Sequence, residues 1–119
     1  MDSVYELYTR GCELLEHGDH QAAIVPLSKA RDLEPDKASV RETLARAYYG
    51  SGRFTQAGEE FERAVEIEPV NDYAHFGLGL CLMRRGDRIG ARRHLKLAVA
   101  MRPDQADYRA ALARVADDA

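Results

Sequence analysis

A 34-residue period runs through this chain of 119 residues and limits its possible folds more than any other feature. Four series of identical residues share the period: Pro35, Pro69 and Pro103; Gly18, Gly52 and Gly86; Ala23, Ala57 and Ala91; and Ala30, Ala64 and Ala98. Two looser series follow it, with small residues at Gly11, Ala45 and Gly79 and large apolar ones at Leu14, Tyr48 and Leu82. A fixed period of this length indicates a repeat protein, in which each copy is one supersecondary unit.

Each copy contains two stretches whose apolar residues recur at helical spacing, as Leu7, Leu14 and Leu15 do in the first stretch. The glycine between the two stretches can adopt the positive φ that ends a helix, and the proline ends the second stretch because helical geometry is disfavoured before proline. The pattern therefore predicts seven helices, at 4–17, 20–33, 38–50, 54–67, 72–85, 88–101 and 105–117.

Local signals add detail to this expectation. Ser3 and Glu6 have the spacing of a capping box, and Asp19 and Asp87 are expected to cap the helices that follow them. The small residues at 11, 45 and 79 are expected to face the alanines at 23, 57 and 91. Pro26 falls inside the predicted helix 20–33, where we expect a tolerated kink on the outer face.

These offsets of glycine, alanine, large apolar residue and terminal proline resemble the tetratricopeptide repeat family over residues 4–105. The resemblance implies an all-α, right-handed superhelical solenoid in one domain. Its repeats would lie at 4–37, 38–71 and 72–105, with a capping helix at 106–119. The chain departs from the family at the position of a large aromatic residue, which is Leu7, Arg41 and His75 here, and at Arg10, where the family has leucine.

The resemblance also implies a concave groove, lined by the first helix of each repeat, that binds a peptide. The predicted groove residues are Tyr5, Tyr8, Cys12, Leu15, Glu42, Arg46, Tyr49, Tyr73, Phe76, Leu80 and Met83. Exposed apolar side chains in such a row are typical of an interaction site, so we expect a partner with an apolar or amphipathic segment, fixed by Glu42 and Arg46. The alternative is that these side chains pack against one another or against a neighbouring helix.

One subclass of the family holds the C-terminal carboxylate of chaperones with Lys, Asn and Arg side chains on this face. The matching positions in this chain are Tyr8, Cys12, Thr43, Tyr73 and Gly77, and none of them carries a charge. The resemblance therefore does not extend to chaperone-peptide binding.

Charge is distributed unevenly along the chain, although the formal net charge is only −3. Residues 1–36 contain three basic and eight acidic residues, whereas residues 84–102 contain seven basic and one acidic. A basic face is predicted from Arg84, Arg85, Arg88, Arg92, Arg93 and Lys96. It could join the acidic first repeat of another copy in head-to-tail self-association, or it could simply be a solvated helix face. Nucleic-acid binding is not predicted, because no aromatic interleaving or recognised motif accompanies these charges.

The sequence offers no support for catalysis, a metal or a cofactor. His17 and His20 lack further ligands at suitable spacing, and neither Cys12 nor Cys81 belongs to a paired motif. The first residues do not form a secretory signal, and the longest near-apolar stretch, 76–83, is too short to span a bilayer. We therefore expect a cytoplasmic, non-catalytic scaffold or adaptor, with a protein or peptide partner and possible homo-oligomers.

Overall fold

The computed structural model describes residues 2–116, which contain helices and no β-strand. The helices are α1 (Val4–Glu16), α2 (His20–Leu33), α3 (Ala38–Gly50), α4 (Phe54–Ile67), α5 (Asp72–Arg84), α6 (Arg88–Met101) and α7 (Ala106–Ala116). They agree with the predicted ranges to within a residue at each end, except that positions 117–119 of the predicted capping helix lie outside the described residues. The all-α fold of three helical hairpins and a further helix is confirmed.

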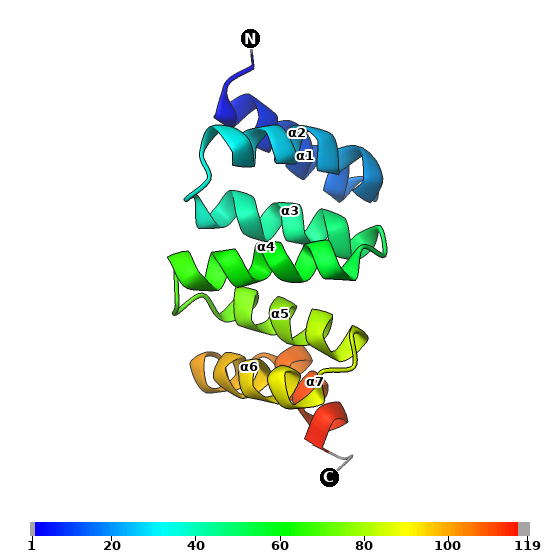
Figure 1. Ribbon diagram of the computed structural model, residues 1–119, viewed down its shortest axis with the longest axis vertical. Helices are drawn as coiled ribbons and strands as arrows, with labels where there is room; N and C mark the ends of the chain where they lie inside the picture. Colours follow the sequence, from blue (N-terminus) through cyan, green and yellow to red (C-terminus); the bar gives the residue numbers. More distant parts are fainter. Residues whose placement is uncertain (1, 117–119) are drawn as a thin grey trace.

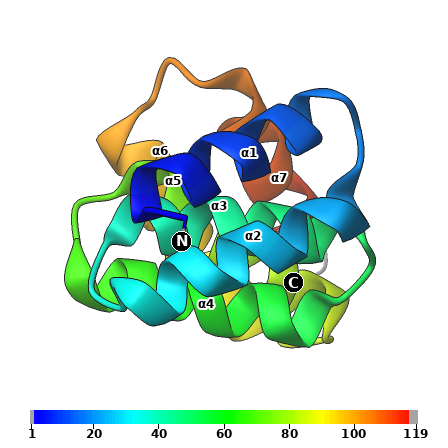
Figure 2. The same ribbon diagram turned by 90° about the horizontal axis from the view of Figure 1, so that it is seen from above.

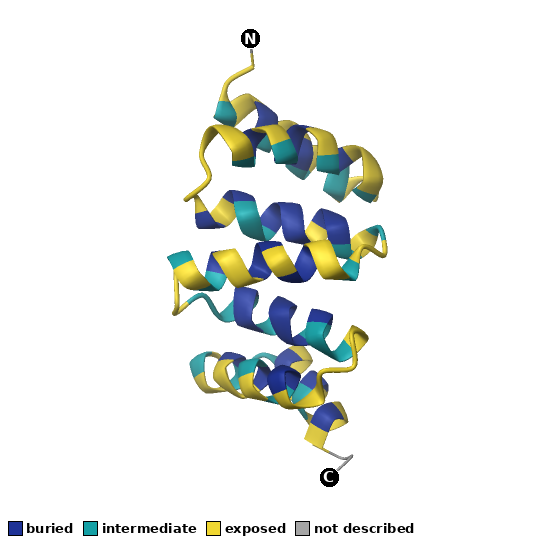
Figure 3. Cartoon of the chain, viewed as in Figure 1, coloured by how far each residue is buried: buried dark blue, intermediate teal, exposed yellow. Residues whose placement is uncertain are grey.

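The helices are stacked along one long axis, from α1 and α2 at one end to α6 and α7 at the other (Figure 1). The described chain measures 52 × 25 × 23 Å along its principal axes. Viewed down the stack, successive hairpins are rotated about the axis and do not eclipse one another (Figure 2). Buried residues predominate on α3 and α5, whereas exposed residues occupy the loops and alternate with buried ones along α4 (Figure 3). This is the arrangement of a solenoid, in which each unit packs on its neighbours.

The three periodic glycines end the first helix of each hairpin, as predicted. Gly18, Gly52 and Gly86 have φ of 79°, 77° and 84°, a region that other residues rarely adopt. The residue after each glycine donates its backbone N–H to a carbonyl of the preceding helix, from Asp19 to Leu14 at 2.8 Å in the first hairpin. These bonds satisfy carbonyls that the helix end would otherwise leave unpaired.

The helix caps follow the sequence only in part. Ser3 and Glu6 form the expected capping box, and Asp87 accepts a hydrogen bond from the Gly90 N–H at 2.9 Å. The prediction for Asp19 is wrong, because its carboxylate makes no capping bond. A Cβ on Gly90 would lie 2.6 Å from the Asp87 carboxylate, so the glycine leaves room for this cap. In the first repeat the corresponding residue is Ala22, whose methyl group occupies that place.

Small residues bring the two helices of a hairpin close together. The alanines at 23, 30, 57, 64, 91 and 98 are fully buried. A Cβ on Gly11 would lie 2.4 Å from Cγ of Leu27, and a Cβ on Gly79 would lie 2.7 Å from Cγ of Leu95. The nearest side chains to these glycines are therefore leucines one helical turn beyond the expected alanines, because the absent methyl leaves room for a large side chain.

The expectation that Pro26 lies on the outer face is wrong. Helix α2 runs through Pro26 without interruption, and the proline is buried. The reason is its register: with Ala23, Leu27 and Ala30 it forms an i, i+3, i+4, i+7 stripe that faces the core. An apolar ring without an N–H suits that stripe despite the lost backbone bond.

Polar pairs occupy the corresponding place in the second and third repeats, where the chain departs from the family's aromatic residue. In the second repeat Arg41 Nη1 donates to Glu60 Oε1 at 2.9 Å. In the third repeat His75 Nδ1 lies 3.0 Å from His94 Nδ1, and the two imidazoles stack. The same side chains also bind the carbonyl of the preceding proline, since Arg41 Nε donates to Pro35 O at 2.9 Å and His75 Nε2 to Pro69 O at 2.8 Å. They tie each first helix to the loop before it.

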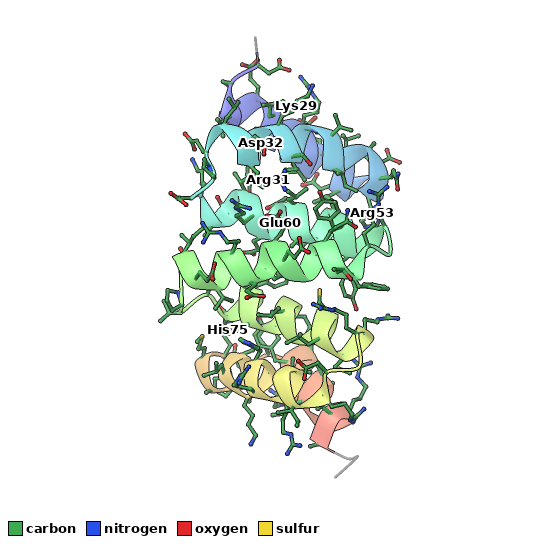
Figure 4. The ribbon with its side chains drawn as sticks, viewed as in Figure 1. Lys29, Arg31, Asp32, Arg53, Glu60 and His75 are labelled. Carbon is green, nitrogen blue, oxygen red and sulfur yellow. The ribbon has the colours of Figure 1, made fainter. Side chains whose placement is uncertain are left out.

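Glu60 also joins the first two repeats. Its Oε2 accepts from Arg31 Nη1 at 2.7 Å, and Figure 4 shows these side chains close together between α2 and α4. The Glu60 side chain is only 9% exposed, compared with 13% for Arg41 and 23% for Arg31. A nearly buried carboxylate is therefore shared by two guanidinium groups, which satisfies the charge that burial would otherwise leave uncompensated.

Candidate functional site

The largest group of predicted groove residues meets in one hollow, which we call the inner pocket. It has a volume of about 240 Å³ and is lined by Leu15, His20, Arg46, Tyr49, Gly50, Phe61, Tyr73, Phe76, Gly77 and Leu80. The lining side chains come from the first helices α1, α3 and α5, with His20 from the start of α2 and Phe61 from α4. Six of the eleven predicted groove residues thus form one site that spans all three repeats.

Gly77 and Phe61 give this pocket its floor. The Phe61 ring lies directly against Gly77, so that a Cβ on Gly77 would be 2.3 Å from Cζ. The second repeat has Thr43 at the position corresponding to Gly77, and Thr43 is buried with its hydroxyl 2.7 Å from the Ser39 carbonyl oxygen. The glycine therefore lets the Phe61 ring, itself only 2% exposed, pack directly against the backbone of α5, where the preceding repeat has a side chain.

Aromatic contacts form the walls. Tyr73 lies edge-on to Phe61, with ring centroids 6.1 Å apart, and next to Phe76 at 6.2 Å. Phe76 in turn stacks on Tyr108 of α7 at 4.6 Å. Tyr73 and Phe76 are half-buried, so part of each ring faces the hollow and part packs against the protein. Tyr73 and Phe76 thus combine packing contacts with a place at the hollow, and their role in binding a partner stays a prediction.

The polar groups around the inner pocket differ in whether they already have partners. Glu42 Oε2 accepts from Asn71 Nδ2 at 3.0 Å, whereas Arg46 is exposed and makes no ion pair within residues 2–116. Burial raises the pKa of Tyr73, because the phenolate is poorly solvated there, while the positive charge of Arg46 opposes the rise. Tyr73 is therefore a neutral hydroxyl at physiological pH, next to a free guanidinium.

The other predicted groove residues lie elsewhere. Tyr5, which is 77% exposed, and Tyr8 line a second hollow of about 530 Å³ with Ser3, Val4, Glu34, Lys37, Ser39 and Val40. Glu42, Cys12 and Met83 line neither hollow. Cys12 is a half-buried free thiol, and Met83 packs against the core formed by α6 and α7. We call the hollow at Tyr5 and Tyr8 the N-terminal hollow.

The residues of the predicted basic face differ in the contacts that they make within the chain. Arg84 lies over Phe54, 4.9 Å from the ring centroid, and donates to the Tyr49 hydroxyl at 3.4 Å. Arg88 donates to the carbonyls of Arg114 and Val115 at the end of α7. Arg85, Arg93 and Lys96 are exposed, and Arg92 is half-buried. Two of the six predicted residues, Arg84 and Arg88, therefore make contacts within the chain.

Four residues of the inner pocket were not predicted: His20, Gly50, Phe61 and Gly77. Gly50 and Gly77 stand out in the sequence only as glycines inside predicted helices, a signal of close packing. His20 packs over Gly50 in the way that Phe61 packs over Gly77. Because both contacts join different helices, helical spacing alone does not reveal them.

A sequence model of the tetratricopeptide repeat family matches this chain over residues 14–69 and 49–115. The chain belongs to the tetratricopeptide repeat (TPR) family. Members of this family are protein-interaction modules, and that general role is the one the family match supports.

The relatives with the most informative matches are much longer than this TPR chain. A TPR repeat-containing thioredoxin of Arabidopsis thaliana is 32% identical over 107 residues, which is 90% of this chain and 16% of the relative. Cellulose synthase 1 operon protein C of Komagataeibacter xylinus is 38% identical over 80 residues, 66% of this chain and 6% of that protein. The chain therefore corresponds to a small part of either relative.

Solved TPR structures match the whole fold at low identity. The first TPR domain of Spaghetti (RPAP3), bound to the HSP90 peptide SRMEEVD, has a TM-score of 0.92 at 17% identity and covers 97% of this chain and 91% of that one. The second TPR domain of human RPAP3, in complex with an HSP70 peptide, has a TM-score of 0.87 at 14% identity, covering 95% and 98%. At these identities the similarity establishes the fold.

Residues 2–116 contain neither a cluster of side chains suited to a metal ion nor a helix suited to span a membrane. No group of three or more His, Cys, Asp or Glu side chains there is placed to hold a metal ion. None of the helices in that range is long and apolar enough to cross a membrane.

Burial raises the pKa of the Cys81 thiol to about 12, so this cysteine is a core residue without nucleophilic character at neutral pH.

Proposed function

We propose that this TPR chain is a non-catalytic interaction module that binds an apolar or amphipathic segment of another protein in its concave groove. The observation that carries the proposal is the inner pocket, where side chains from three repeats surround one apolar hollow. Solved TPR neighbours are described as bound to peptides, which supports a peptide as the kind of partner. Free thiols at Cys12 and Cys81 suit a cytoplasmic adaptor or scaffold.

The HSP90 and HSP70 peptides of those neighbours are not the ligands we propose. Of the five positions that match the family's carboxylate-binding set, Thr43 and Gly77 are buried, and the Tyr8 hydroxyl lies 3.3 Å from Thr43 Oγ1. None of the five is charged. A terminal carboxylate at these positions would lose its hydration without gaining a cation.

Two contacts along the groove suit an extended or helical segment. The inner pocket would take one anchoring side chain, and the N-terminal hollow at Tyr5 and Tyr8 would contact a second part of the partner. Preformed hollows require little reorganisation, so we expect reversible binding, about micromolar for an interface on the order of 1,000 Å².

The test is to identify partners in extract by affinity capture and then to map the binding of one purified partner by NMR chemical shifts. We expect the shifts to cluster at the inner pocket, and Tyr73→Ala to weaken binding at least about tenfold. Ile89→Ala is the matched control, because Ile89 is a large apolar side chain that is exposed and lines neither hollow. A partner that binds Tyr73→Ala as tightly as the native chain would contradict the groove proposal.

Head-to-tail self-association is the second candidate, favoured by the acidic first repeat and the basic third repeat. Arg85, Arg93 and Lys96, like Arg84 and Arg88, are exposed, and these charges would make such a contact. Light scattering should then show larger particles at low salt that dissociate near 1 M, where the Debye length is about 3 Å. A particle mass that does not change with salt would eliminate this candidate.

A further inference from the structure

The inner pocket has a distinct charge character. The chain contains 20 acidic residues, yet none of the ten residues that line the pocket is Asp or Glu. Arg46 and His20 are among the lining residues. The lining of the pocket therefore contributes the positive charge of Arg46 and no negative charge. It is complementary to a negatively charged ligand.

Arg46 is the charge that a ligand can use. The nearby cation Arg84 is held against Phe54 and Tyr49, and the nearby carboxylate of Glu42 accepts from Asn71. Arg46 is exposed at the pocket and forms no ion pair with any residue between 2 and 116. A carboxylate brought to Arg46 would therefore not have to displace an existing partner.

The rest of the hollow is apolar and small. Its floor is the Phe61 ring under Gly77, and Tyr73, Phe76 and Leu80 contribute to its walls. A volume of about 240 Å³ lies below the roughly 300–1,000 Å³ typical of sites for whole small molecules and cofactors. The hollow fits a single large side chain of a polypeptide better than a free metabolite.

We infer that the inner pocket recognises an acidic–apolar segment of a partner protein. A large aliphatic or aromatic side chain enters over Phe61, and an Asp or Glu beside it in the partner's sequence pairs with Arg46. This inference rests on the proposed groove function and adds the chemistry of the partner. It requires no free C-terminus, because the carboxylate belongs to a side chain.

A library of random 12-residue peptides, displayed on phage with both ends linked, tests the inference on the purified native chain. We expect the selected peptides to share a large apolar residue with Asp or Glu close to it. On the Arg46→Glu variant, Lys or Arg should replace the acidic residue, because the charge at the pocket is reversed. The best acidic peptide, labelled for fluorescence polarisation, should bind this variant at least about tenfold more weakly.

Arg93→Glu is the matched control, since Arg93 is an exposed arginine of α6 that lines neither hollow. It makes the same charge change and should alter the affinity of the acidic peptide less than about twofold. Thermal unfolding followed by circular dichroism verifies that both variants keep the fold.

The outcomes distinguish a failure of the inference about charge from a failure of the proposed groove function. One outcome is that the selected peptides are apolar without an acidic preference, bind Arg46→Glu normally and no longer bind Tyr73→Ala. It would overturn the inference about charge but leave the groove function intact. Peptides that bind regardless of Tyr73, or no enrichment at all, would overturn both.

Discussion

Two buried glycines within helices separate the effect of packing from that of backbone propensity. A methyl group on Gly77 would lie 2.3 Å from the buried Phe61 ring, whereas one on Gly58 would lie 3.4 Å from Cβ of Cys81, an ordinary contact. Replacing glycine by alanine in a helix is favourable by about 1 kcal/mol when space permits. We expect Gly58→Ala to raise the free energy of unfolding by about 0.5–1 kcal/mol and Gly77→Ala to lower it by about 1–2 kcal/mol.

Urea denaturation of both variants measures this difference, with the native chain as reference. A Gly77→Ala variant at least as stable as the native protein would mean that Phe61 moves aside without cost. In that case the floor of the inner pocket is adaptable and not rigid.

His94 makes stability depend on pH. Burial lowers the pKa of His94, and the neighbouring His75 and Arg93 lower it further, while Asp87 opposes the change. Because the folded pKa is below the unfolded value of about 6.5, the unfolded chain takes up the proton first. We expect the free energy of unfolding to fall as the pH drops below about 6.5, toward the folded pKa.

The variant His94→Asn isolates this contribution. Asparagine can place an N–H donor near the position of Nδ1, 3.0 Å from His75 Nδ1, but it does not titrate. Denaturation curves at about pH 8 and about pH 5.5 should show a smaller loss of stability for the variant than for the native chain. Equal losses would assign the pH dependence to other groups.

At the scale of elements, α7 closes the C-terminal end of the array. Tyr108, Ala111 and Val115 are buried, and the Tyr108 hydroxyl donates to Asp72 Oδ2 at 2.7 Å. Burial, and with it this bond to a carboxylate, raises the pKa of Tyr108 well above its usual range, so the hydroxyl remains a donor at any physiological pH. Removing α7 would expose the apolar face that these residues cover.

We expect a chain ending at Asp104 to lose at least about 3 kcal/mol of unfolding free energy, since burial of each large side chain contributes roughly 1.5–3 kcal/mol. It should also bind the dye ANS more strongly, because Phe76, Leu80 and Met83 lose the helix packed over them. Tyr5→Ala, which removes an exposed aromatic ring, is the control. Unchanged denaturation of the shortened chain would show that α7 is not required as a cap.

The elements could be predicted closely because their signals are local. Gly18 ends α1 and Pro35 follows α2, and neither signal depends on which helices pack together. The helix bounds can therefore be predicted from a few neighbouring residues. Contacts between helices were harder to predict. The burial of Pro26 and the pairing of Arg41 with Glu60 depend on which face meets a neighbour. Spacing places the groove residues on one helix face but does not reveal that Phe61, from α4, reaches Gly77.

At the scale of the whole molecule, the two ends of the array differ. Two series of positions, each with the 34-residue period, carry apolar residues that are buried or half-buried. The first series is Val40, Ala74 and Tyr108, and the second is Leu44, Leu78 and Leu112. The corresponding positions of the first repeat are Glu6 and Arg10, both exposed. These two positions are therefore polar in the first repeat, and no further helix within residues 2–116 covers them.

Because each helix packs mainly on its sequence neighbours, the repeats should open separately. The second repeat has a neighbour on both sides and should show the slowest amide hydrogen exchange. The third is covered by α7 and should come next, and the first, held on one side only, should exchange fastest. Hydrogen exchange followed by mass spectrometry measures this order.

Glu60→Gln tests whether contacts between repeats set that order. It removes the carboxylate shared by Arg31 and Arg41, which should cost roughly 2 kcal/mol because two partly buried guanidinium groups lose their counter-charge. Exchange should accelerate in the first repeat and in α3 and α4 but not in α6, which this charge does not reach. Arg63→Gln, which breaks only exposed ion pairs, should leave every segment unchanged. If Glu60→Gln accelerates α6 as much as α2, the array opens as one cooperative unit, and the inner pocket, built from three repeats, would be lost only by global unfolding.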